Sequence, residues 1–166
     1  IDCSSTLGDP KREPAAWYVD PVSIEPVRMG DWIGSVAEGG SVNFFEVKLN
    51  PHGNGTHTEC YGHLTDARVA LSDVFNGYLG LSSLHSLDLP YGKAIEERHL
   101  PKTSHPALIL RTSKDGFSAK DFSNSEPSYI NPKAMETIVA LGVEHLLIDL
   151  PSVDPEFDQG KLIAHR

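Results

Sequence analysis

The sequence predicts an α/β fold built as a single domain over residues 1–166, and three segments carry this prediction. Residues 107–112 begin with an apolar run and end in polar residues, as expected of a buried strand. Over 132–141, apolar residues recur at helical spacing between an Asn-Pro start signal and a glycine stop. Residues 143–150 then predict a second buried strand, which a proline ends. A helix that leads directly into a buried strand is typical of α/β architecture.

The N-terminal part of the chain is expected to be irregular before its first clear strand. Prolines and glycines spread over residues 1–40 break any helical period and predict short extended pieces joined by turns. The β-forming residues of 41–49 predict a strand with an imperfect alternation. Residues 50–55 have turn chemistry, and Thr56 to Leu64 are expected to form a strand or an extended loop.

The middle of the chain gives weaker patterns. Residues 67–74 are compatible with a short helix, whereas the Leu-Ser-Ser-Leu-His-Ser-Leu run at 81–87 fits neither the helical nor the strand period. Residues 113–128 are polar and predict a loop.

Composition and charge exclude several classes of protein. Apolar residues make up 39% and charged residues 22% of the chain, as in ordinary globular proteins. A formal net charge of -9 disfavours nucleic acid and anionic membrane surfaces as partners. The apolar runs are much shorter than the roughly 20 residues of a membrane-spanning helix. The absence of a Gly-x-Ser-x-Gly elbow and of a phosphate-binding loop argues against a serine hydrolase or a nucleotide enzyme.

The two cysteines, Cys3 and Cys60, say little about the compartment. They could form one disulfide, but their spacing indicates neither a disulfide framework nor a CxxC metal site. Cys60 is expected to point away from its polar neighbours and to pack as a small apolar residue. We expect a cytoplasmic protein, with the redox compartment left open by cysteine usage alone.

The richest chemistry lies in the segment that follows the glycine-rich turn. If this segment is extended, His57, Glu59, Tyr61 and His63 all point to the same face. Imidazole and carboxylate are the donors that zinc and manganese bind, so His57 and Glu59 can ligate a metal while His63 carries protons beside it. An isolated His-x-Glu pair is more often a surface or hydrogen-bonded pair than a metal site, so both interpretations of His57 and Glu59 stay open on spacing alone.

Four segments of the chain resemble one known family. The run from Asn54 to His63 is similar to the His-x-Gly-Thr-His-x-Asp-x-x-x-His signature of the metal-dependent cyclase family, which includes bacterial kynurenine formamidases and isatin hydrolases. Residues 16–21 resemble the family's Trp-Pro-Gly-Asp segment, and 108–112 resemble its central strand ending in Arg-Thr. Residues 148–155, Ile-Asp-Leu-Pro-Ser-Val-Asp-Pro, closely resemble a run that precedes a further histidine in the family.

The resemblance implies a role for each matching residue. It makes His57 and His165 metal ligands, Glu59 the counterpart of a ligating Asp, and His63 the catalytic acid/base. It also implies that Trp17 lines the substrate pocket. The implied architecture is the family's swivelling β/β/α arrangement, a β-rich core flanked by a few helices, and the implied state is a homo-oligomer. Family members continue beyond the position of the final residue here, so the chain is expected to lack the family's C-terminal segment.

One departure from the family's pattern concerns the first ligand of the signature. That histidine falls at Gly53, which has no donor atom, so the ligand is missing unless His52 replaces it. His52 has the wrong strand parity, but a bulge or tight turn at Gly53 would swing it inward. A site with one metal instead of two is a further alternative.

Two further features, a glycosylation sequon and the carboxylate of Asp154, are expected to have no part in the chemistry of the site. Asn54-Gly55-Thr56 fits the glycosylation sequon but lies inside the proposed site turn, where a glycan would block access. Asp154 is expected to fix its own loop by accepting backbone N–H groups rather than to bind metal.

Two functions follow as hypotheses. The leading one is a metal-dependent hydrolase that cleaves the C–N bond of an aryl formamide or a cyclic amide (a lactam), using zinc or manganese, a metal-activated water and His63 as acid/base. The alternative is a non-catalytic member of the same fold that binds a small molecule or a partner, because losing the ligand at Gly53 weakens a metal site.

Overall fold

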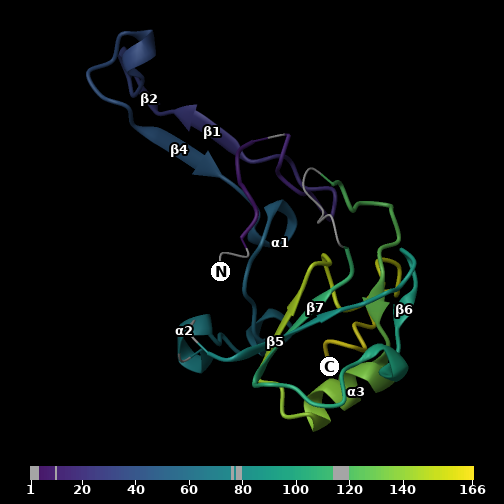
Figure 1. Ribbon diagram of the computed structural model, residues 1–166. Coiled ribbons are helices and arrows are strands. Elements are labelled where there is room, and N and C mark those ends of the chain that lie inside the picture. Colours follow the sequence, from purple (N-terminus) through teal and green to yellow (C-terminus); the bar gives the residue numbers. More distant parts are fainter. Residues whose placement is uncertain (1–3, 10, 76, 78–79, 114–119) are drawn as a thin grey trace. The chain divides into compact units, whose positions relative to one another are not determined.

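The computed structural model describes residues 4–9, 11–75, 77, 80–113 and 120–166, and it divides the chain into two compact units. The first unit comprises residues 1–56 with 118–123, and the second comprises 57–117 with 124–166. Among the described residues, the predicted α/β class is confirmed, with small sheets and few helices (Figure 1). The expectation of one domain over 1–166 stays a prediction.

The first unit is built from short strands, as its prolines and glycines predict. β1 (Ser23–Pro26) pairs antiparallel with β4 (Phe45–Lys48), and β2 (Arg28–Met29) pairs antiparallel with β3 (Trp32–Ile33). A 3₁₀ turn, η1 (Val36–Glu38), follows β3. The strand predicted over 41–49 is confirmed in its second half, by β4.

The first unit continues after β4 into a single helical turn, α1 (Pro51–Asn54). The side chain of Asn50 accepts a hydrogen bond from the backbone N–H of His52 at 3.0 Å, and Pro51 occupies the first helical turn. The expected turn chemistry at 50–55 is therefore an N-cap followed by a proline, a combination that starts helices.

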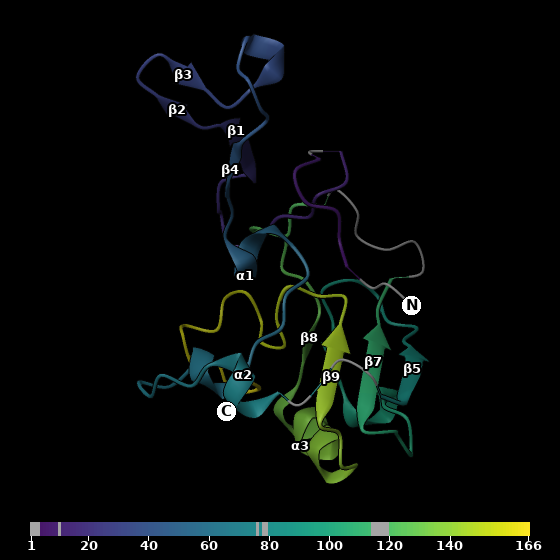
Figure 2. The same ribbon diagram turned by 90° about the vertical axis from the view of Figure 1, so that its left-hand side faces the viewer.

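The second unit contains the hydrophobic core. Its main sheet is parallel, in the order β5 (Ser82–Ser86), β7 (Ala107–Arg111) and β9 (His145–Ile148), and Figure 2 shows β7 and β9 as neighbouring arrows. A second parallel pair joins β6 (Ala94–Ile95) to β8 (Tyr129–Ile130). The buried cluster beneath these strands consists of Leu87, Ile95, Leu108, Leu110, Ile130, Ala134, Ile138 and Leu150.

The predicted helix of this unit is confirmed as α3 (Pro132–Ala140). The Asn131 side chain accepts from the backbone N–H of Ala134 at 3.1 Å, and Gly142 has a φ of 73° just beyond the helix. That φ lies in the left-handed region, where glycine is favoured at helix ends. Ala134 and Ile138 face the core, which couples the helix to the strands on either side of it in sequence.

Of the two alternatives predicted over Thr56 to Leu64, a strand or an extended loop, the structure has the loop over residues 56–60 and departs from both beyond Cys60. Residues 56–60 form no strand ladder, and Tyr61 to His63 form a single turn of 3₁₀ helix, η2 (Tyr61–His63). The Cβ that an alanine would add at Gly62 would lie 2.4 Å from the carbonyl oxygen of Val69. The 3₁₀ turn lies at this close backbone approach, and the alternation of a strand does not extend through His63.

Other parts of the second unit lie where the sequence patterns were weak. The short helix expected within 67–74 is confirmed as α2 (Leu71–Val74), and a 3₁₀ turn, η3 (Glu97–His99), follows β6. The run at 81–87 contains β5, an edge strand whose Leu84 is exposed on one face. Residues 114–119 of the predicted loop lie outside the described residues, as does Cys3.

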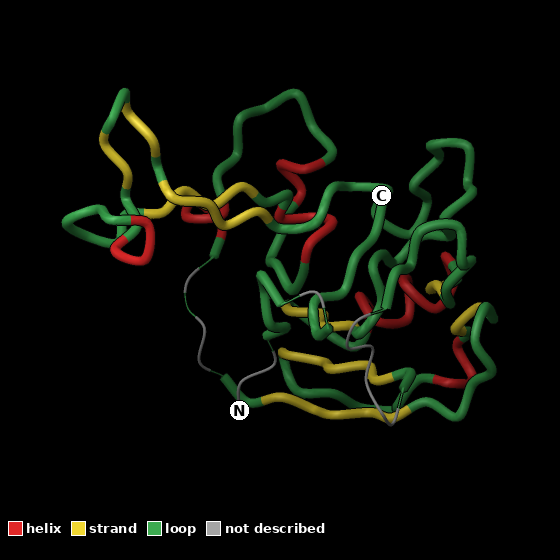
Figure 3. Tube along the Cα trace, turned by 90° about the horizontal axis from the view of Figure 1, so that it is seen from above, coloured by secondary structure: helices red, strands yellow, loops and turns green. Residues whose placement is uncertain are grey.

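Much of the described chain is loop and turn, as the green segments of Figure 3 show. Within the described part, none of the helices has the length and hydrophobicity that crossing a membrane requires. The residues of the candidate site in the second unit lie in such loops and turns.

Candidate metal centre

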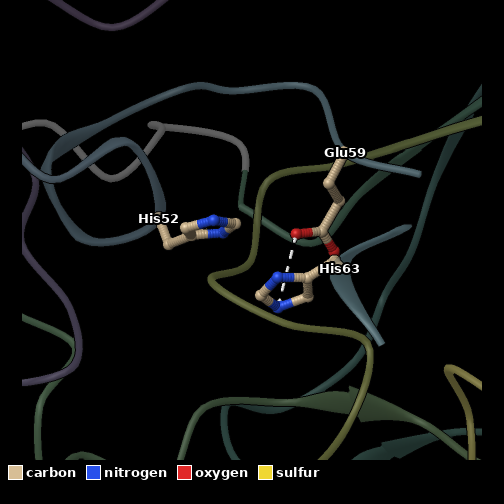
Figure 4. Close-up of side chains that lie close together, drawn as sticks. All are labelled: His52, Glu59 and His63. Atoms are coloured by element: carbon tan, nitrogen blue, oxygen red, sulfur yellow. Dashed lines mark ion pairs between the residues drawn. The ribbon is translucent and has the colours of Figure 1, made fainter. Parts of the chain in front are cut away.

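The 3₁₀ turn η2 brings His63 back toward Glu59. Cys60 has an extended backbone, and the N–H of His63 then donates to the carbonyl oxygen of Cys60 at 2.9 Å. As a result, Nε2 of His63 lies 3.9 Å from Oε2 of Glu59 (Figure 4). The sequence predicted this proximity from strand alternation, but the turn produces it.

His57 reaches the same carboxylate from the extended part of the segment. Its Nε2 lies 3.7 Å from Oε2 of Glu59. The two residues are separated by one position, so an extended backbone places both side chains on one face. The predicted pairing of His57 with Glu59 is thus present in the second unit.

The fourth side chain comes from the end of the chain. Nε2 of His165 lies 3.2 Å from Oε1 of Glu59, and the ring centroids of His165 and His63 are 6.5 Å apart. Glu59 is therefore the common partner of three imidazoles, although His165 is separated from it by 106 residues. The structure brings together every candidate site residue that belongs to the second unit.

Asp154 holds His165 from behind. Its side chain is 3% exposed, and it accepts a hydrogen bond from the Ala164 N–H at 2.7 Å and one from Nδ1 of His165. The expectation that Asp154 accepts backbone N–H groups is confirmed. Its contact with the imidazole ring is a further feature that the sequence did not indicate.

The charges of the centre stabilise one another. Hydrogen bonding to His165, and then to His57, holds the pKa of Glu59 well below its usual range, against the opposing effect of burial. The same contact with Glu59 is the main cause that raises the pKa of His165, and Asp154 adds to it. The carboxylate consequently stays ionised at neutral pH, which is the form that binds a cation.

The spacing of these groups fits a divalent metal. Two donors that bind one zinc ion at about 2.0–2.2 Å lie roughly 3–4 Å apart. The distances from the Glu59 oxygens to His165, His57 and His63 are 3.2, 3.7 and 3.9 Å. Neutral imidazoles and a carboxylate are also the donor types of zinc and manganese sites. Each imidazole therefore lies near enough to a Glu59 oxygen to share a metal ion with that carboxylate.

The position of the family's first histidine has no room for a side chain. A Cβ at Gly53 would lie 2.4 Å from Cγ2 of Val19 and 2.8 Å from the carbonyl oxygen of Ala16, closer than Cβ atoms approach other groups. The N–H of Ala16 also donates to the Gly53 carbonyl oxygen at 2.9 Å. Glycine is therefore required here by the packing of the first unit.

The remaining candidates, His52 and Trp17, also belong to the first unit. The ring of His52 is exposed on α1, and its proposed role as a replacement ligand stays a prediction. Trp17 is 37% exposed and has a φ of 61°, followed by Tyr18 with a φ of 57°. Left-handed backbone in such residues is strained by roughly 1–3 kcal/mol each and is enriched at functional sites. The role of Trp17 in binding substrate stays a prediction.

The predictions that Asn54 is not glycosylated and that Cys60 packs as a small apolar residue both agree with the structure. Asn54 is fully buried, and its amide donates to the Asp20 carbonyl oxygen at 3.0 Å, so the sequon is not a glycan acceptor in this fold. Cys60 is half-buried and forms no disulfide within the described residues, which agrees with a packing role.

Comparisons with known proteins show the family of the chain. The family model described as a putative cyclase matches residues 1–155. The kynurenine formamidase of Bordetella petrii is 28% identical over 152 residues, which cover 84% of this chain and 70% of that protein. The kynurenine formamidase of Geobacillus thermodenitrificans is 29% identical over 120 residues, covering 72% of this chain and 56% of that protein. Because the family model spans most of the sequence, the chain belongs to the cyclase family.

Proposed function

We propose that the protein is a metal-dependent hydrolase that cleaves the C–N bond of an aryl formamide or a cyclic amide. The observation that carries this proposal is the contact of one carboxylate, Glu59, with the imidazoles of His57, His63 and His165. The names of the related kynurenine formamidases support an aromatic formamide such as N-formylkynurenine as the substrate.

His57, Glu59 and His165 are the proposed ligands of a zinc or manganese ion, and His52 is the proposed further ligand. When bound, such an ion polarises the scissile carbonyl and lowers the pKa of the attacking water toward neutrality. The ionised state of Glu59 supports this assignment, because the carboxylate needs no deprotonation before it binds a cation.

His63 is the proposed general acid and base. Its side chain is 42% exposed, more than those of the other three residues of the centre, so water and substrate can reach the ring. In the proposed mechanism it takes a proton from the attacking water and returns a proton to the leaving nitrogen. The proton balance is closed, because the amine leaves with the proton that the water supplied.

Trp17 is the proposed wall of the substrate pocket, since an indole ring stacks on a flat aromatic substrate. The strained backbone at Trp17 and Tyr18 supports a functional role for this segment.

A second candidate is a non-catalytic member of the family that binds a small molecule or a partner. The packing at Gly53 favours it, because no substitution at that position can restore the family's first ligand without displacing Val19. Metal content separates the candidates: near-stoichiometric zinc or manganese supports the hydrolase, and a protein that stays metal-free after incubation with both ions supports the binder.

The catalytic role of His63 is tested by His63→Ala in the metal-loaded protein. We expect bound metal to remain and turnover of an aryl formamide to fall by about 10²–10⁴-fold, the usual contribution of a general acid–base group. His105→Ala is the matched control, because His105 is exposed and lies in the same unit. Unchanged turnover in His63→Ala would refute the assigned role.

Homo-oligomerisation and a cytoplasmic location remain predictions. Light scattering of the purified protein measures the mass of the particle in solution and so tests homo-oligomerisation. A mass equal to one chain at micromolar concentration would contradict an oligomer.

A further inference from the structure

Asp154 is an almost fully buried carboxylate whose contacts converge on the residues around His165. Its Oδ1 accepts from the N–H of Ala164 at 2.7 Å. Its Oδ2 accepts from the N–H of His165 at 3.3 Å and also contacts Nδ1 of the same residue. The two contacts with backbone N–H groups are enough to hold the loop in place. The contact with Nδ1 is different, because it also fixes the orientation of the imidazole ring.

The contact with the ring determines which imidazole nitrogen carries hydrogen. An ionised carboxylate only accepts hydrogen bonds, so Nδ1 of His165 must be the donor. Nε2 lies 3.2 Å from Oε1 of Glu59, and that carboxylate also only accepts, so without a metal the protonated ring donates from both nitrogens. A metal ion held by Glu59 would replace the hydrogen on Nε2, while the hydrogen on Nδ1 would stay with Asp154, so that Nε2 becomes the donor atom.

We propose that Asp154 is a positioning residue that holds His165 in its Nδ1–H tautomer and directs Nε2 toward Glu59 as a metal donor. This inference rests on the proposed metal-dependent function. Carboxylates behind ligating histidines fix the ring and raise its basicity, and their loss typically lowers metal affinity by about 10–100-fold.

Asp154→Asn separates this role from simple bracing of the loop. Either orientation of the amide turns an NH₂ group toward an N–H donor, at Ala164 or at His165. With the NH₂ group beside the ring, Nδ1 must accept, the hydrogen moves to Nε2, and the donor atom is lost. We expect the Zn²⁺ affinity of the purified protein, measured by competition with a chromophoric chelator, to fall by about 10–100-fold.

Asp158→Asn is the matched control. Asp158 braces the same C-terminal segment by accepting from the N–H groups of Gly160 and Leu162 at 2.8 and 2.5 Å. The same chemical change there is expected to leave Zn²⁺ affinity unchanged. Equal losses in the two variants, or no loss in Asp154→Asn, would overturn the inference.

A measurement on the unsubstituted protein covers the case in which Asp154→Asn does not fold. Nitrogen-15 NMR of the metal-free protein, with the His165 ring neutral, is expected to show a protonated Nδ1 and an unprotonated Nε2. The opposite tautomer would overturn the inference. Zn²⁺ binding without formamide turnover would contradict only the proposed substrate class. Failure of the proposed function can therefore be distinguished from failure of the inference about Asp154.

Discussion

The elements β7, β8, α3 and β9 and the segment from His57 to His63 belong to the same unit but are stabilised by different means. The four elements bury Leu108, Leu110, Ile130 and Ile138 almost completely, and their backbone is paired in a helix and in parallel sheets. The segment from His57 to His63 has no strand ladder, and its site residues are half-buried or exposed. It is held by one 3₁₀ turn and by the contacts of Glu59 with imidazoles.

The difference separates stability from chemistry. Apolar burial supplies the larger part of folding free energy, whereas a cluster of ionisable groups in partial contact with water adds little to it. Metal ligands need access to the ion and to substrate, and the segment that carries the proposed ligands is correspondingly open. Substitutions in the two regions should therefore affect different measurements.

The largest expected effect is on metal content, in His57→Ala. Removal of this donor leaves Glu59, His165 and the further proposed ligand His52, and we expect near-stoichiometric zinc to fall to background in elemental analysis. The thermal stability of the metal-free protein should change little, because the His57–Glu59 contact is partly exposed. Retained zinc in His57→Ala, with His105→Ala as control, would remove His57 from the ligand set.

The opposite result is expected in the core, for Leu110→Ala. Leu110 is fully buried between the strands and α3, so the cavity should cost about 2–5 kcal/mol of unfolding free energy in urea denaturation. Metal binding by the folded fraction should be preserved. Val139→Ala, at a position on α3 that is 68% exposed, is the control and should change stability by less than about 0.5 kcal/mol.

An intermediate loss of stability is expected for Gly53→Ala. The added Cβ meets Val19 and the Ala16 backbone, and such overpacking costs about 1–3 kcal/mol. Gly80→Ala is the control, because a Cβ there has open space around it. If Gly53→Ala were as stable as the control, the close packing at Gly53 would not explain why glycine stands where the family signature has a histidine.

The smallest effect is expected at the helix cap. Asn131→Ala removes the acceptor for the Ala134 N–H and should lower the free energy of unfolding by about 1 kcal/mol. Asn131→Ser keeps a capping oxygen and should retain most of the stability. Equal losses in both variants would show that another group caps α3.

The helix–strand unit was predictable because its signals are local. An Asn-Pro start and a glycine stop bound α3, and the apolar runs of β7 and β9 are typical of buried parallel strands. Capping and apolar periodicity act over a few residues, so one segment of sequence contains the whole signal. The pairing of His57 with Glu59 was local in the same sense.

The course of the chain through His63 was not predictable in this way. Alternation predicted a common face for residues 57–63, but the chain forms a 3₁₀ turn over 61–63, where Gly62 lies against the Val69 backbone. The approach of two backbone segments is a tertiary event, which the sequence pattern of either segment does not contain. For the same reason β5 was not recognised, because its pairing with β7 makes it a strand.

By itself, the sequence determined the α/β class, the capped helix, the buried strands and the donor residues that resemble those of the cyclase family. Only the tertiary structure decided that Glu59 meets His165 across 106 positions and that Asp154 contacts the ring behind it. The physical reason is that residue types specify which contacts are favourable, whereas closure of the chain around a core decides which distant partners come within hydrogen-bonding distance.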